Sequence, residues 1–268
     1  ARLVAGPQAT LEDVQVVREE LGLDKPIHEQ YITYVTGLLK GDLGTSLRTK
    51  RPVAVEVSNR YANTAKLTLL ALAWSTIVGV LLGVWSGRHR SRWQDYTGMT
   101  LAVSGISLPS FWVGFMLIMV FSVNLKWFPT TGADSLKSLV LPSIALGSSI
   151  AAIIARFTRS SIIEVLKDDY IRTARAKGLR ERVVVWKHAF RNAMISVVTV
   201  VGLQFGFLLG GSVVTESVFA FPGLGSLLVE SVNYRDYPAI QSLILIFSLH
   251  FVVINLIVDV LYAVLNPE

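Results

Sequence analysis

The strongest constraint in this sequence is a set of five long stretches that contain no Asp, Glu, Lys or Arg. They cover residues 67–87, 96–125, 138–155, 192–215 and 237–258. Each is close to or longer than the ~20 residues that an α-helix needs to cross about 30 Å of hydrocarbon. Five such helices would not fit the single core of a soluble helical bundle. The sequence therefore predicts an all-α membrane protein.

The composition supports this interpretation. Only 16% of the 268 residues are charged, whereas about a quarter is usual for a soluble domain. The absence of cysteine excludes disulfides and thiolate metal sites. The net charge of +6 could suggest nucleic acid as a partner, but the position of the basic residues explains it better.

Charge in the linkers predicts the orientation. The turn after the first stretch has Arg88, Arg90 and Arg92 against Asp95 alone, and linker 156–191 has ten basic against four acidic residues. The second and fourth linkers are not basic. By the positive-inside rule we expect the turn, the long linker and the C-terminus to be cytoplasmic.

We expect two regions: an extracytoplasmic segment over 1–66 with short amphipathic helices, and a transmembrane domain over 67–268. The expected membrane helices cover about 67–87, 96–125, 138–160, 190–215 and 237–262, with a cytoplasmic loop at 161–189. In the first region, Thr10 and Asp13 form a capping-box-like start, and Gly22 and Gly41 end two helices. Pro26 precedes an expected apolar face of Ile27, Tyr31, Tyr34, Val35 and Leu38. An odd number of crossings leads us to expect a sixth, N-terminal helix ahead of this segment.

The long linker is too long for a simple turn. Its start continues the third membrane helix, a short helix follows over 169–177, Gly178 reverses the chain, and a return helix begins at Glu181. Small residues at Ala174 and Ala176 would let another protein approach closely. This predicts a cytoplasmic elbow.

The elbow resembles the inner loop of binding-protein-dependent ABC importer permeases, in the version found in the dipeptide, oligopeptide, nickel and glutathione group. The resemblance rests on Arg172-Thr173-Ala174-Arg175-Ala176-Lys177-Gly178, preceded by Asp169-Tyr170-Ile171 and followed by His188-Ala189-Phe190-Arg191-Asn192-Ala193-Met194. It implies a coupling helix that contacts an ATPase subunit. The implied coupling residues are Asp169, Tyr170, Arg172, Thr173, Ala174, Arg175, Ala176, Lys177 and Gly178. The chain departs from the family at Ser196, where peptide-group members usually have proline.

Further segments resemble the same group, namely 41–46, 215–225, 235–238 and 266–267. Residues 127–135 look most like the glutathione permease. The resemblance implies a type I ABC importer permease in the bacterial inner membrane, a non-catalytic transport subunit that moves small peptides by alternating access. It implies a second permease subunit, two cytoplasmic ATPases that bind ATP and Mg, and an extracytoplasmic substrate-binding protein as partners. This chain would bind no cofactor itself.

Alternatives remain at this stage. Nickel or another metal chelate could be the substrate within the same family. A self-contained channel or secondary carrier would need inverted repeats, and no internal repeat is found. An enzyme is disfavoured because the chain contains neither a phosphate-binding Gly-x4-Gly-Lys-Ser/Thr loop nor a His-Glu-x-x-His motif. The four histidines are scattered, giving no sequence support for a metal site.

Polar residues inside membrane stretches are candidates for the pathway because burying them in lipid is costly. Gln204 and His250 lie within such stretches. Glu216 adjoins the outer end of one and is a candidate for gating the pathway or docking the binding protein. The alternatives are interhelical hydrogen bonding for Gln204 and His250, worth about 0.6 kcal/mol each, and a plain surface loop for Glu216. Two sets of glycines at intervals of four predict close helix packing: Gly79, Gly83, Gly87, and Gly202, Gly206, Gly210. Pro109 and Pro142 should kink helices or mark their ends.

Overall fold

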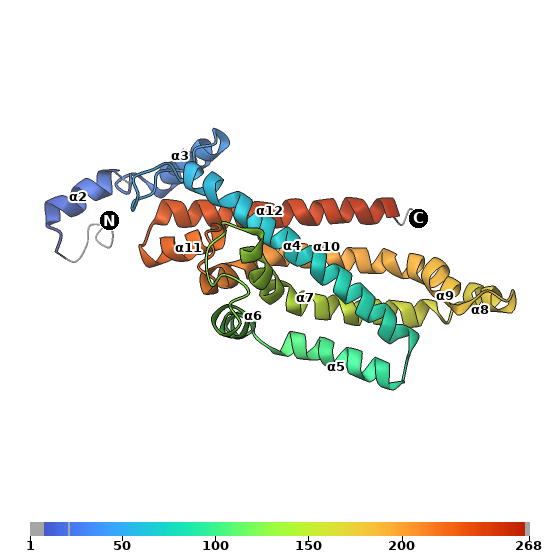
Figure 1. Ribbon diagram of the computed structural model, residues 1–268. Helices are drawn as coiled ribbons and strands as arrows, with labels where there is room; N and C mark the ends of the chain where they lie inside the picture. Colours follow the sequence, from blue (N-terminus) through green and yellow to red (C-terminus); the bar gives the residue numbers. More distant parts are fainter. Residues whose placement is uncertain (1–7, 21, 266–268) are drawn as a thin grey trace. The chain divides into compact units, whose positions relative to one another are not determined.

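The computed structural model describes residues 8–20 and 22–265, and these form helices joined by short connections (Figure 1). The elements in chain order are α2 (Leu11–Glu20), α3 (Ile27–Leu39), α4 (Val53–Arg88), α5 (Trp93–Ser107), α6 (Ser110–Leu117), η1 (Ile118–Asn124), α7 (Leu136–Val165), α8 (Asp169–Ala176), α9 (Glu181–Val183), η2 (Val184–Ala189), α10 (Phe190–Val218), α11 (Leu224–Asn233) and α12 (Tyr237–Leu265). Stretches η1 and η2 are π-helical. The all-α prediction is confirmed.

The chain divides into two compact units. The smaller contains the described residues up to Tyr61 together with Leu227–Ile246, and the larger contains Ala62–Ser226 and the described residues from Phe247 onward. The division differs from the expected one because Leu227–Ile246 belongs to the smaller unit. The expected boundary at 66/67 lies inside α4, one continuous helix of 36 residues. No glycine or proline interrupts residues 53–78, so nothing in the sequence ends the helix there.

Four segments of the described chain are long and apolar enough to cross a membrane. They are Val53–Arg88, Leu136–Val165, Glu181–Val218 and Tyr237–Val260. A bent pair, Trp93–Ser107 followed by Ser110–Asn124 with 100° between the two helices, makes a fifth crossing if the two helices form one broken span. The expected single helix over 96–125 is therefore wrong. Pro109 has no N–H to donate and disfavours helical geometry at Leu108, so α5 ends there and α6 begins in a new direction.

The larger unit is built on α7. In the most apolar stretch of α7, 72% is buried. In the corresponding stretch of the segment Glu181–Val218, which contains α10, the buried share is 33%. Both α5 and α10 lie alongside α7 (Figure 1). The main core joins buried side chains of several helices and of the segment after α10, including Leu67, Leu146, Ile154, Leu208 and Phe221.

The predicted close packing of the first glycine set is confirmed. A Cβ on Gly83 would lie 2.5 Å from Thr158 Cβ and 2.6 Å from the Ala155 carbonyl oxygen, both on α7. A Cβ on Gly79 would lie 2.7 Å from the Ala151 carbonyl oxygen. Helices α4 and α7 therefore touch along their backbones, as small residues permit in membranes.

The second glycine set is only partly a packing face. A Cβ on Gly202 would overlap Val258 of α12, and one on Gly206 would lie 3.1 Å from the Phe251 ring, whereas one on Gly210 would meet nothing within 4 Å. The prediction therefore holds for two of its three members.

The smaller unit contains the predicted caps. Thr10 and Asp13 exchange hydrogen bonds, with Thr10 N donating to Asp13 Oδ2 at 2.9 Å and Asp13 N donating to Thr10 Oγ1 at 3.2 Å. The hydrogen bonds from Thr10 lower the pKa of the Asp13 carboxyl from its ordinary value. Gly22 and Gly41 have φ of +62° and +81°, as helix ends at glycine require. Helix α3 has no fully buried residue, and of its expected apolar face only Val35 and Leu38 are half-buried.

A polar cluster joins distant segments of the smaller unit. Asp236 is buried and accepts hydrogen bonds from the Ser46 hydroxyl and, at 3.0 Å, from Leu47 N. Glu230 pairs with Arg48 at 3.2 Å and with Arg60 at 3.3 Å. The loop before α4 is therefore fixed to α11 and to the start of α12.

We predict that Gly83→Ala destabilises the chain. The added methyl would overlap the α7 backbone, and overpacking of this kind costs about 1–3 kcal/mol. Gly210→Ala is the matched control, because a methyl there meets nothing within 4 Å and alanine favours helix. Thermal unfolding in detergent should show a lower midpoint for Gly83→Ala and an unchanged or higher one for Gly210→Ala. Equal midpoints for the two variants would contradict the close α4–α7 contact.

Candidate functional site

The elbow has the predicted geometry. Helix α7 ends at Val165, α8 follows after a short bend, and Gly178 turns the chain with φ of +76° into the return segment that begins at Glu181. Gly178 N donates to the Arg175 carbonyl oxygen at 2.9 Å. A Cβ on Gly178 would meet no atom within 4 Å, so backbone conformation and not space favours glycine here.

The inner face of α8 packs against the return segment. Ile171 and Ala174 are buried in a cluster with Val184 and Ala189 of η2, and Val165 and Leu166 cover its edge. Ala174 is only 7% exposed. We therefore correct one expectation: Ala174 stabilises the elbow itself and does not offer a small side chain to another protein, whereas Ala176 is exposed.

The outer face of α8 is polar and charged. Arg172 pairs with Asp169 at 3.5 Å, and the Asp169 side chain is 95% exposed. Arg175 binds Glu181 through two nitrogens, at 2.8 and 3.2 Å. This contact raises the pKa of Arg175 from its ordinary value, so the guanidinium stays charged. Such an exposed face can exchange its ion pairs for those of a partner.

One hydrogen bond ties the elbow to the membrane helix that follows it. Asn192 Nδ2 donates to the Tyr170 hydroxyl at 2.6 Å, which joins α8 to the first turn of α10. Thr173 donates to the Asp169 carbonyl oxygen within α8, and Lys177 is exposed at its C-terminal end. The structure thus places all nine predicted coupling residues on one elbow, with Ala174 facing inward.

Glu216 is fully buried at the outer end of α10, with 0% of its surface exposed. The Thr64 hydroxyl of α4 donates to one carboxylate oxygen at 2.7 Å, and Ser226 N donates to the other at 3.0 Å. Leu224 N donates to Thr64 Oγ1 at 2.8 Å. A Cβ on Gly225 would lie 2.9 Å from the carboxylate. Glu216 therefore locks the segment after α10 against α4, and the alternative of a plain surface loop is wrong.

The other two pathway candidates lie elsewhere. Gln204 is half-buried on α10, and His250 is half-buried on α12. Gln204 and Glu216 are twelve positions apart on one helix, which corresponds to roughly 18 Å. Gln204 and Glu216 therefore do not share one binding site, and both Gln204 and His250 stay predictions as pathway residues.

Sequence reasoning missed an ion pair at the other end of α4. Asp95 is 3% exposed and accepts from Arg159 Nε at 2.5 Å and Nη2 at 2.7 Å. The Ser86 hydroxyl and the Ser91 backbone N donate to the same carboxylate. The available signal was that Asp95 is the lone acid in a basic turn. Its partner is 64 positions away, which the sequence did not indicate.

The described residues contain no group of three His, Cys, Asp or Glu side chains that could hold a metal ion. The described part of the larger unit thus contains three polar sites: the elbow, the Glu216 lock and the Asp95–Arg159 ion pair.

Comparison with known proteins identifies the family. Residues 79–268 match the family described as binding-protein-dependent transport system inner membrane component, and residues 1–68 match the N-terminal domain of the same components. The chain belongs to this family. It is the membrane-spanning permease subunit of an ABC importer, a multi-pass protein of the inner membrane that works with an ATPase and a substrate-binding protein.

Individual relatives are similar over the whole chain. The glutathione transport system permease proteins GsiC of Salmonella typhimurium and of Escherichia coli are each 55% identical over 267 residues, covering 100% of this chain and 87% of the relative. Among solved structures, an inward-facing MetNI methionine ABC transporter matches 79% of this chain and 96% of its own, with a TM-score of 0.68 and 18% identity. An amino acid ABC transporter matches with a TM-score of 0.62 and 16% identity, covering 77% of this chain and 92% of its own. These two support the fold alone, and they confirm the type I permease architecture.

We predict that Glu216→Gln destabilises the chain by about 2 kcal/mol, because a neutral amide accepts hydrogen bonds more weakly and brings N–H groups into a site already supplied with donors. Glu230→Gln makes the same chemical change at an exposed ion pair, where we expect a loss of no more than about 1 kcal/mol. Chemical unfolding of both variants in detergent measures the difference. A Glu216→Gln loss as small as that of Glu230→Gln would contradict the lock.

Proposed function

We propose that this permease imports glutathione or closely related small peptides. The observation that carries the proposal is the 55% identity to glutathione permeases along the whole chain. These relatives are named as glutathione permeases, so the nickel alternative has less support.

We further propose that the elbow is the coupling element. Its packed inner face and charged outer face suit a helix that is held by its own chain and touched by a partner. ATP and Mg would be bound by two partner ATPases, a second permease would complete the pathway, and the C-terminus would be cytoplasmic. This chain would supply no catalytic group.

Uptake of labelled glutathione by cells that express the chain with its operon partners tests the substrate. We expect uptake that unlabelled glutathione and short peptides compete for, and no accumulation of nickel. Nickel accumulation without glutathione uptake would favour the alternative substrate.

We predict that Gly178→Val abolishes transport while membrane insertion stays intact. A β-branched residue strains the left-handed backbone by about 1–2 kcal/mol and shifts the elbow. Gly178→Asn is the matched control, because asparagine tolerates this conformation. We expect Gly178→Asn to keep most of the uptake. Uptake by Gly178→Val equal to wild type, at equal membrane levels, would overturn the role of the turn.

The cysteine-free sequence permits a direct contact test. Ala176→Cys places a single thiol on the exposed side of α8, and Leu136→Cys places one on the exposed start of α7, on the predicted outer side. We expect only Ala176→Cys to crosslink to an ATPase subunit, and the yield to change with ATP and vanadate. A conjugate from neither variant, with the Ala176→Cys thiol accessible from the cytoplasm, would contradict the coupling proposal.

A further inference from the structure

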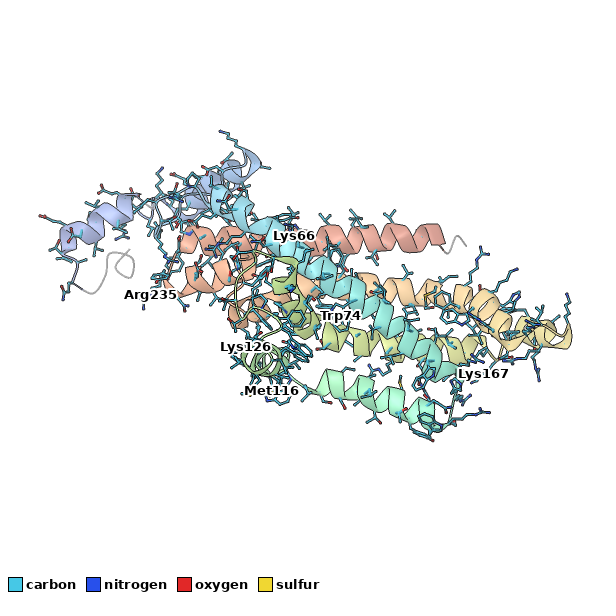
Figure 2. The ribbon with its side chains drawn as sticks, viewed as in Figure 1. Lys66, Trp74, Met116, Lys126, Lys167 and Arg235 are labelled. Atoms are coloured by element: carbon cyan, nitrogen blue, oxygen red, sulfur yellow. The ribbon has the colours of Figure 1, made fainter. Side chains whose placement is uncertain are left out.

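A basic hollow of about 380 Å³ lies at the elbow end of α7, beside the turn between α4 and α5. Figure 2 labels Lys167 near that turn. The hollow is lined by Arg90, Arg159, Ser160, Ile163, Glu164 and Lys167. Glu164 is the one carboxylate in this lining.

The cations of the hollow are not fully neutralised. Arg159 directs two nitrogens at Asp95 and is paired. Within the described part of the chain no ion pair or side-chain hydrogen bond is found for Arg90 or Lys167, and Glu164 is the one carboxylate among the lining residues. The hollow therefore keeps a net positive charge that is open to an anion.

The hollow lies at the level where a membrane ends. Charge-free residues on α4 reach Gly87, where a Cβ would lie 3.0 Å from Ile162 of α7, so Arg90 and Lys167 come three and five positions beyond this level on their own segments. Long basic side chains at helix ends reach the headgroup layer. By the positive-inside rule this layer is the cytoplasmic one, where anionic lipids attract basic residues.

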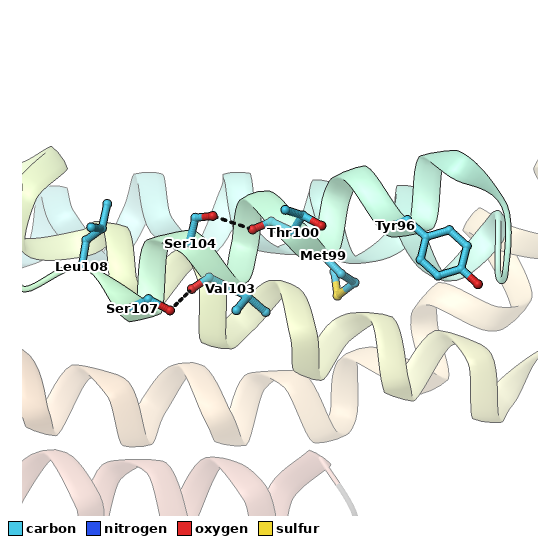
Figure 3. A pocket seen from close by; sticks show the side chains of 7 residues that line it. All are labelled: Tyr96, Met99, Thr100, Val103, Ser104, Ser107 and Leu108. Atoms are coloured by element: carbon cyan, nitrogen blue, oxygen red, sulfur yellow. Dashed lines mark hydrogen bonds between the residues drawn. The ribbon is translucent and has the colours of Figure 1, made fainter.

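An open groove of about 550 Å³ runs along α5 from the same end (Figure 3). Tyr96 lines its start and lies close enough to Arg159 for an electrostatic interaction. Beyond Tyr96 the lining is Met99, Thr100, Val103, Ser104, Ser107 and Leu108. Ser104 donates to the Thr100 carbonyl oxygen at 2.9 Å and Ser107 to that of Val103 at 3.0 Å, so these hydroxyl hydrogens are already used. The groove can therefore accept a hydrocarbon chain.

We propose that the hollow and the groove together bind one anionic phospholipid of the cytoplasmic leaflet. The phosphate contacts Arg90 and Lys167, and an acyl chain lies along α5 against Met99, Val103 and Leu108. Basic pockets between membrane helices on the cytoplasmic side are suited to such headgroups. A phospholipid would use both the charged hollow and the apolar groove. A free phosphate would use only the hollow.

Lipid titration of the full-length chain, stripped of lipid in a neutral detergent and observed by native mass spectrometry, tests this. The probes are dioleoyl phosphatidylglycerol, the matching phosphatidylcholine, and inorganic phosphate. With two cations contributing, we expect phosphatidylglycerol to bind about 30-fold more tightly than phosphatidylcholine. Arg90→Gln with Lys167→Gln should remove this preference.

Two further variants sharpen the test. Arg180→Gln with Arg182→Gln removes the same charge from exposed residues of the elbow and should leave the preference intact. Val103→Trp blocks the groove and should weaken binding of both lipids.

Three results would overturn the proposal. The first is a preference that survives Arg90→Gln with Lys167→Gln. The second is displacement of phosphatidylglycerol by millimolar inorganic phosphate, which would indicate a free-anion site. The third is loss of lipid binding once the partner subunits are assembled, which would show that a protein covers the groove.

Discussion

The larger unit depends on the contact between α4 and α7. Lipid tails are as apolar as helix side chains, so helices in a membrane associate through close packing. Gly79 and Gly83 remove side chains from one face of α4 and let its backbone touch that of α7. This proximity lets Trp74 Nε1 of α4 donate to the Ser143 carbonyl oxygen of α7 at 2.8 Å. A face of small residues thus positions the polar contacts between the two helices.

The two buried carboxylates of the larger unit contact α4 at two widely separated positions. Thr64 and Ser86 of α4 contact Glu216 and Asp95 respectively. They are 22 positions apart, which corresponds to roughly 33 Å of helix and matches the thickness of a hydrocarbon core. Each carboxylate is hydrogen-bonded, as burial of a charge requires. The two buried carboxylates therefore lie about one hydrocarbon thickness apart, near the two ends of the charge-free stretch 67–87 of α4.

Local features were predictable from the sequence, and distant pairings were not. The charge-free stretches located the spans, and the Thr10–Asp13 cap, Gly22, Gly41 and the Gly178 turn were identified because neighbouring residues determine them. The partners of Asp95 and Glu216 lie 64 and 152 positions away, and one sequence gives no measure of such distances. Glu216 also follows directly after a charge-free stretch, which is typical of a loop residue, whereas α10 continues to Val218.

The two prolines Pro109 and Pro142 also show that local sequence does not decide the structure by itself. Pro109 separates two helices by 100°, while Pro142 lies inside the continuous helix α7. In α7 the surrounding turns are buried against other helices, and Ser143 donates to the Val140 carbonyl oxygen at 2.8 Å close to the proline. Tertiary packing can hold a helix across a proline in a membrane protein. Proline position alone therefore indicates where a helix can break, and the packing decides whether it does.

The elbow combines two kinds of contact with different energies. Its inner face is fixed to the return segment by buried Ile171 and by the Tyr170–Asn192 hydrogen bond, so α8 and the start of α10 should move as one body. Its outer ion pairs are exposed, and pairs of this kind are worth about 0–1 kcal/mol each. A partner can replace them at little cost while the inner contacts stay in place. When a partner displaces the outer face, the movement would then be passed on to α10 while the elbow stays intact. A coupling element needs this property.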